Sequence, residues 1–146
     1  MIAMLSMALI MACQQAKTPV TTRFCWALAE VESNCDPCAV NAAENAVGWL
    51  QIRPIYLRDV NRIIEAQGLR DELFILSDRA DPKKSIRMAQ IYLEYYARHL
   101  RSKGYRIGYP EIAAIHRHGP GWRPWRQTAL DHRRARVIKT RMGIKD

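Results

Sequence analysis

The residues best suited to chemistry lie in one stretch that begins with Glu32. Glu32 falls in the last turn of a predicted amphipathic helix, where the partial negative charge of the helix C-terminus disfavours a second negative charge. Trp49 and Leu50 follow in a short apolar segment, and apolar neighbours strip water from a carboxylate. Both effects favour a protonated carboxyl group, which can donate its proton to a glycosidic oxygen. Glu32 is therefore a candidate general acid, although its spacing also fits a glutamate exposed at a helix end.

Residues downstream of Glu32 could bind a sugar or supply a second acid. Gln51 can hydrogen-bond an N-acetyl group or a hydroxyl, and Trp49 can stack on a sugar ring or pack in the core. Glu44 lies in the intervening loop and is the candidate second acid, with Asp36 nearby. The separation of two such acids distinguishes retaining from inverting hydrolysis.

Helical spacing, capping residues and turn residues predict the elements that position these side chains. The predicted helices run from Thr21 or Thr22 to Ser33, from Pro54 to Gln67, from Pro82 to the stop at Gly104, from Pro110 to Ile115 and from Leu130 to Met142. Residues 38–52 form a predicted loop or small hairpin, and residues 69–79 a short helical turn and loop. Because no long alternating pattern is present, the expected class is α+β, predominantly helical, with a small β-hairpin or loop region.

The stretch around Glu32 resembles the lysozyme-like superfamily, in its branch of soluble lytic transglycosylases and phage wall-degrading enzymes. The matching blocks are Glu32-Ser33, Asp36-Pro37-Cys38-Ala39 and Ala46-Val47-Gly48-Trp49-Leu50-Gln51, in the family's order and spacing. The resemblance implies a glycosidase-type enzyme that cleaves peptidoglycan at the β-1,4 bond between N-acetylmuramic acid and N-acetylglucosamine. It gives Glu32 the role of catalytic acid/base, without cofactor or metal. It also implies substrate contacts for Ser33, Gly48, Trp49 and Gln51.

A third segment, from Ala114 to Gly121, resembles the family's groove-lining motif with two departures. His116 stands where the family has Tyr and Arg117 where it has Asn, and both are expected to contact substrate. The family's transglycosylases need one acid, because the substrate's own 6-hydroxyl closes on the anomeric carbon, whereas a lysozyme could use Glu44 as well. Both activities remain open. The altered motif also leaves an alternative, a catalytically inactive wall-binding or virion/secretion structural protein with the same fold.

The chain has 146 residues and a formal net charge of +9, which suits one domain with a polyanionic partner. Eight basic and two acidic residues fall within residues 121–146, so most of the excess lies in the C-terminal segment. We expect a loosely held, mostly solvated helix that assists binding to the bacterial wall, with a helix lacking any dedicated ligand as the alternative. No nucleic-acid partner is expected, because no zinc-finger, homeodomain or RNA-binding aromatic motif is present.

Residues 1–20 are predicted to be a signal or lipoprotein leader, or else an N-terminal helix and tether, ahead of a catalytic domain over 21–146. The apolar run Ile2–Ala12 is too short to span a bilayer and suits the core of a secretion signal, although no basic residue precedes it. Ile10-Met11-Ala12-Cys13 resembles a lipoprotein cleavage box, so Cys13 is a candidate membrane anchor. The expected location is extracytoplasmic, in the periplasm or envelope, or else in a phage virion or lysis product.

The remaining cysteines are Cys25, Cys35 and Cys38. If Cys13 carries the lipid, these three allow one disulfide at most, and packing of Cys25 in the core is the alternative. Cys35-Asp-Pro-Cys38 has the spacing of half a zinc site, but the two histidines at 116 and 118 are too close together to supply the other half.

Overall fold

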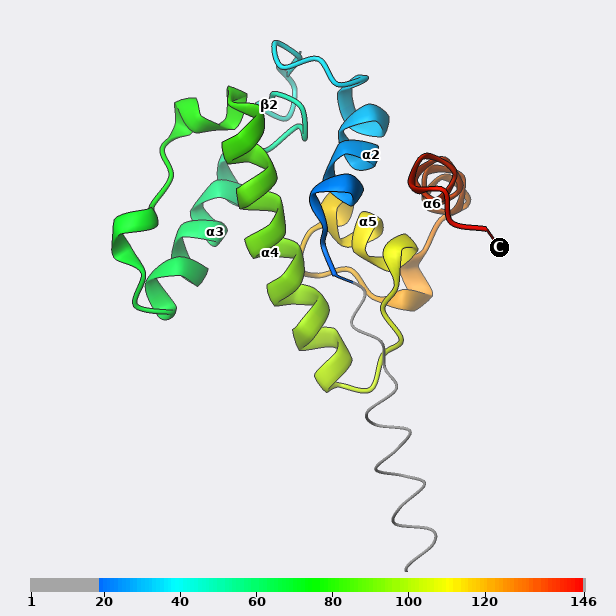
Figure 1. Cartoon of the computed structure of the whole chain (residues 1–146). Helices are drawn as coiled ribbons and strands as arrows, with labels where there is room; N and C mark the ends of the chain where they lie inside the picture. Colours follow the sequence, from blue (N-terminus) through cyan, green and yellow to red (C-terminus); the bar gives the residue numbers. More distant parts are fainter. Residues whose placement is uncertain (1–18, 146) are drawn as a thin grey trace, which may run out of the picture.

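The computed structural model describes residues 19–145 and is built mainly of α-helices (Figure 1). In chain order the elements are α2 (Thr22–Ser33), β1 (Val40–Asn41), β2 (Ala46–Val47), α3 (Pro54–Ala66), the 3-10 turns η1 (Arg70–Glu72) and η2 (Leu76–Ala80), α4 (Pro82–Ser102), α5 (Tyr109–His118), the 3-10 turn η3 (Pro124–Arg126) and α6 (Ala129–Met142). The predicted α+β, predominantly helical fold is confirmed.

The helices begin where the capping residues predict. The side chain of Thr21 accepts a hydrogen bond from the backbone N–H of Phe24 at 3.1 Å and opens α2. Asp81 accepts from the N–H of Lys84 at 2.9 Å and opens α4, with Pro82 in the first turn, where its missing N–H costs nothing. At the other end of α2, Asn34 adopts the left-handed conformation that terminates the helix directly after Ser33. Local chemistry therefore sets the position of Glu32 in the final turn.

The segment between α2 and α3 contains the small hairpin that was one of its two predicted forms. β1 and β2 pair antiparallel, with Val40 opposite Val47 and Asn41 opposite Ala46. Each strand has two residues, too few for an alternating pattern, which explains why the sequence did not distinguish a hairpin from a loop.

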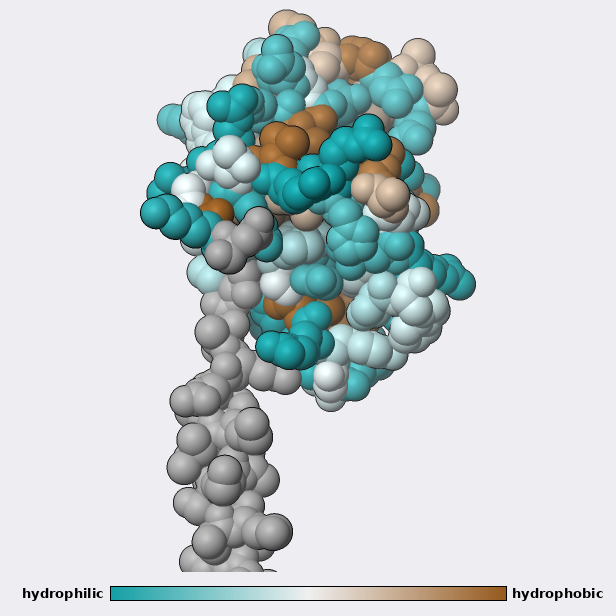
Figure 2. Space-filling view, turned by 90° about the vertical axis from the view of Figure 1, so that its right-hand side faces the viewer, coloured by the Kyte–Doolittle hydropathy of each residue, from teal (hydrophilic) through white to brown (hydrophobic). Residues whose placement is uncertain are grey.

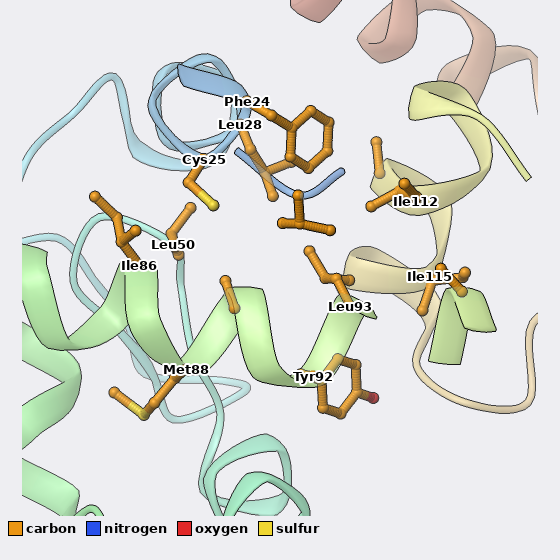
Figure 3. Packing of buried hydrophobic residues seen from close by; sticks show 14 of the residues in the cluster. Phe24, Cys25, Leu28, Leu50, Ile86, Met88, Tyr92, Leu93, Ile112 and Ile115 are labelled. Atoms are coloured by element: carbon orange, nitrogen blue, oxygen red, sulfur yellow. The ribbon is translucent and has the colours of Figure 1, made fainter. Parts of the chain in front are cut away.

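The core lies between α2, α3, α4 and α5, and Figure 3 shows part of it. Phe24 and Leu28 from α2 face Leu93 of α4 and Ile112 of α5, and all four side chains are fully buried. Burial of a side chain of this size contributes about 1.5–3 kcal/mol. α5 extends to His118, three residues past the predicted end, so the predicted groove residues at 116 and 117 lie on this helix.

The C-terminal helix α6 packs against α2 and α5 (Figure 1), so the expectation of a loosely held helix was wrong. Asp131, Ala135, Ile138 and Met142 are buried and recur every three or four residues, which forms one face along the helix. The arginines of α6 lie outside this narrow buried face. The surface on the side of α6 is mostly hydrophilic, with separate hydrophobic spots (Figure 2).

The expected leader and the candidate anchor Cys13 lie outside the residues that the structure describes. Between residues 19 and 145, no helix has the length and apolar character required to cross a membrane.

Candidate active site

Glu32 lies in the last turn of α2 and faces α6. Its side chain is 14% exposed and forms an ion pair with Arg134, which is 18% exposed. The two residues are 102 positions apart, and the packing of α6 on α2 brings them together.

A polar cleft of about 340 Å³ surrounds this carboxylate. Its lining contains five of the predicted site residues: Glu32, Glu44, Gln51, His116 and Arg117. The remaining lining residues are Asn41, Ala46, Arg53, Tyr56, His118 and Arg134. The hairpin region and α5 thus meet the end of α2, and Glu32, Gln51 and His116 share one cleft.

Gln51 is fixed by the loop that precedes α3. Its backbone φ is +48°, in the left-handed region, and its side-chain Nε2 donates hydrogen bonds to the carbonyls of Gly48 at 3.0 Å and Ala39 at 3.3 Å. With the N–H groups engaged, Oε1 is the side-chain atom left to accept from a sugar hydroxyl or an amide N–H.

Three predicted substrate contacts, Ser33, Gly48 and Trp49, do not line the cleft. The Ser33 hydroxyl donates to the Trp49 carbonyl at 2.8 Å and so ties the end of α2 to the hairpin region. The Trp49 ring packs edge-on against Trp26, with ring centroids 4.6 Å apart. These side chains are engaged by the protein and support the loop that carries Gln51.

Gly48 is required by its backbone surroundings. Its φ is +79°, and a Cβ placed on it would lie 2.2 Å from the carbonyl oxygen of Arg79. Arg79 is itself buried and donates to the carbonyls of Asn45 at 2.7 Å and Ile52 at 3.0 Å. Only glycine allows this close approach, so Gly48 shapes the site without contacting the cleft.

His116 forms part of the cleft lining and has both ring nitrogens engaged. Nε2 lies 2.9 Å from the carbonyl of Leu50, which can only accept, so Nε2 carries the proton. Nδ1 lies 3.2 Å from the Tyr56 hydroxyl and accepts from it. Burial lowers the pKa of His116, in keeping with this neutral tautomer. The one N–H of the His116 ring therefore already donates to the backbone carbonyl of Leu50.

The lowered pKa of His116 makes stability depend on pH. As the pH falls through the ordinary histidine pKa of about 6.5, the unfolded chain takes up a proton that folded His116 resists. The free energy of unfolding therefore falls with pH until the folded pKa is reached. We expect His116→Gln to flatten this part of the curve, measured as melting temperature between about pH 7.5 and pH 5. Parallel curves for both proteins would contradict this account of His116.

Arg117 and the neighbouring His118 are tied to α6 through Asp131. Arg117 Nη1 lies 3.2 Å and His118 Nε2 lies 2.9 Å from Asp131 Oδ1, and the Asp131 side chain is 1% exposed. Burial opposes the ionised form, but hydrogen bonds from Thr128 and His118 outweigh it and lower the pKa of Asp131 to about 2. Arg117 lines the cleft while serving this anchor, so its role is at least partly to hold α6.

Arg134 and Asp131 are functional candidates that sequence reasoning missed. The pattern Thr128-x-x-Asp131 is a capping box and marks the start of α6 in the sequence. No local pattern indicates Arg134, because its partner is on another helix far along the chain.

The cysteines hold no disulfide within the described part of the chain, where Cys25, Cys35 and Cys38 are all free. Cys25 is packed in the core, and burial raises the pKa of its thiol to about 12. No group of three or more potential metal ligands occurs among residues 19–145.

A family model described as the transglycosylase SLT domain matches residues 10–109. The matched region contains Glu32, Glu44 and Gln51 and ends at the first residue of α5, before His116 and Arg134. No curated protein and no solved structure matches the chain.

Proposed function

Because the chain belongs to the transglycosylase SLT domain family, whose general activity is the lytic cleavage of peptidoglycan, we propose that it acts on the β-1,4 bond between N-acetylmuramic acid and N-acetylglucosamine. The observation that carries this proposal is the position of Glu32, half-buried at the end of α2 in a polar cleft with Gln51. Most of the residues that line the cleft belong to the segment that the family model matches.

In this proposal Glu32 acts first as acid and then as base. It donates its proton to the glycosidic oxygen, and the bond from that oxygen to C1 of N-acetylmuramic acid breaks. Positive charge develops on the sugar ring beside the new carboxylate. The carboxylate then accepts the proton of the same sugar's 6-hydroxyl, whose oxygen bonds to C1. The product is a 1,6-anhydro sugar, and Glu32 has regained its proton.

Arg134 takes part in this cycle through its contact with Glu32. The first step needs the Glu32 carboxyl group free to reach the glycosidic oxygen, whereas Arg134 engages it in the structure. Substrate therefore has to separate the two side chains before the proton is donated. Once Glu32 becomes a carboxylate, a guanidinium nearby stabilises it.

The role of Glu44 distinguishes the two reactions under consideration, hydrolysis by a lysozyme and lytic transglycosylation. It is exposed on the hairpin turn and lines the same cleft as Glu32. A lysozyme would use a second carboxylate to activate water or attack the sugar. We propose the one-acid transglycosylase, because the family model names that activity.

A second candidate function is wall binding without catalysis. The observation that favours it is the engagement of Glu32 by Arg134 and of Arg117 by Asp131, both within the protein. Turbidity of a purified peptidoglycan suspension distinguishes the two. We expect the purified protein to clear the suspension; a protein that sediments with peptidoglycan and leaves its turbidity unchanged would support the binding function instead.

The exposed cations of the C-terminal segment are expected to concentrate the protein on anionic wall polymers. Arg133, Arg136 and Lys145 are exposed (the α6 side is seen in Figure 2), whereas Arg134 is engaged in the cleft. Replacing these three with Gln should weaken sedimentation with intact walls at low salt, since salt screens such contacts. Turnover of a short uncharged oligosaccharide should stay unchanged. Equal loss on both substrates would assign the three residues to the catalytic fold.

We also propose an extracytoplasmic site of action, in the envelope or during phage lysis, because peptidoglycan lies there. Lipid anchoring through Cys13 stays a prediction. Mass measurement of the mature protein tests it, because cleavage before Cys13 and acylation change the mass together.

A further inference from the structure

A second cavity, of about 540 Å³, opens beside the cleft that contains Glu32. The two cavities share Arg53, Tyr56 and His118 in their linings, so they are contiguous. A strand held in the cleft would thus present any side branch to this second cavity.

One side of the second cavity is aromatic. Tyr56 stacks on Tyr92 with ring centroids 3.7 Å apart, and Tyr92 meets Tyr96 edge-on at 4.8 Å. The hydroxyls of Tyr56 and Tyr96 are engaged with His116 and Asp59, so these two tyrosines offer mainly ring surface. Such surface packs against aliphatic groups of a ligand.

The polar side of the cavity carries an excess of positive charge. Arg53, Arg58 and Arg62 line it together with one acid, Asp59. Arg62 pairs with Asp59 at 2.7 Å, so the negative charge of Asp59 is balanced by Arg62. Within residues 19–145, neither Arg53 nor Arg58 forms a side-chain hydrogen bond or an ion pair. A guanidinium binds a carboxylate through two parallel hydrogen bonds, so the two free arginines suit a ligand with carboxylate groups.

We propose that this cavity binds the peptide stem attached to N-acetylmuramic acid, with its carboxylates on Arg53 and Arg58 and its aliphatic parts on the tyrosines. The inference rests on the proposed function, because the stem branches from the sugar that the cleft holds. A strand stripped of its peptides would cover the tyrosines but would keep only the lactyl carboxylate of N-acetylmuramic acid, one negative charge for two guanidinium groups. The chain is thereby specific for strands that carry peptides.

The kinetic test compares peptide-bearing glycan strands with the same strands after an amidase has removed the peptides. Arg58 is exposed and lines the second cavity without lining the cleft, so its charge can be reversed without touching Glu32. Loss of a charge-assisted hydrogen bond should lower kcat/KM of Arg58→Glu about tenfold on peptide-bearing strands, mainly through KM. Stripped strands should be cleaved equally by both proteins, and Arg58→Lys should recover part of the loss. Arg98→Glu, on an exposed arginine of α4 that lines neither cavity, should behave as wild type.

A binding measurement separates this inference from the proposed function. The probe is an N-acetylmuramyl tripeptide with free carboxylates, and the control is its fully amidated form, each titrated into the Glu32→Gln protein by calorimetry. We expect the amidated form, or the additional Arg58→Glu change, to weaken binding about tenfold. Equal affinity for both probes, or equal wild-type kcat/KM on peptide-bearing and stripped strands, would overturn the stem site even if the protein cleaves both. Selective binding without any cleavage would uphold the stem site and overturn the proposed activity.

Discussion

Glu32→Gln is expected to reduce the release of soluble products from purified peptidoglycan by about 10²–10⁴-fold, because the amide cannot donate or accept the catalytic proton. Glutamine has the same size and keeps an acceptor oxygen for Arg134, so α6 should stay in place. The melting temperature should change little, since both partners are partly exposed and such ion pairs contribute little. Product release and thermal unfolding, measured on the same preparation, check both statements.

Two matched variants define the specificity of that result. Glu30→Gln changes a glutamate on the same helix that pairs with Arg141 at 2.5 Å and does not line the cleft, and it should keep nearly full activity. Glu44→Gln removes the other carboxylate of the cleft and should also stay active, because a transglycosylase needs one acid. A Glu32→Gln protein with more than about half of the wild-type rate would contradict the assignment of Glu32 as the catalytic acid. Inactive Glu44→Gln would favour a two-acid lysozyme.

Gly48→Ala is expected to lower the free energy of unfolding by about 3 kcal/mol or more. The new Cβ would lie 2.2 Å from the carbonyl oxygen of Arg79, and φ of +79° adds strain for any residue with a Cβ. The contacted atom is backbone, so relief requires movement of the loop around Arg79 and of the hydrogen bonds that Arg79 donates to Asn45 and Ile52. In a domain of this size the melting temperature should fall by about 10 °C.

Gly68 provides the control for the conformational part of this effect. It has φ of +78° with no atom within 4 Å of a Cβ placed on it, so Gly68→Ala carries the backbone strain without the clash. We expect a loss of about 1–2 kcal/mol there. Equal destabilisation by the two substitutions, measured by denaturant unfolding, would show that the contact with Arg79 is not what requires glycine at position 48.

Local rules account for the elements that the sequence predicted correctly. Thr21 and Asp81 cap their helices through contacts within three residues, and Pro54 and Pro82 begin helices because of their own fixed φ. Glu32 and Gln51 share one cleft because a helix end and the loop that follows it stay close in space.

The remaining features depend on tertiary packing. Trp49 packs against Trp26 of α2 and does not line the cleft. This orientation depends on how the segment after α2 folds back onto that helix. The expectation of a loosely held α6 was wrong because Ile138 is buried on the same face as Asp131, which anchors the helix to α5. The pair of Glu32 with Arg134 joins two helices that share no sequence pattern.

Lytic transglycosylation by one acid leaves a distinct end group on the glycan products, which mass spectrometry of the soluble products from purified peptidoglycan detects. We expect N-acetylmuramic acid termini in the 1,6-anhydro form, about 18 Da lighter than the hydrolytic products because no water is added. The Glu32→Gln protein should release none of them. Reducing termini from the wild-type protein would contradict transglycosylation, and unchanged peptidoglycan would contradict catalysis altogether.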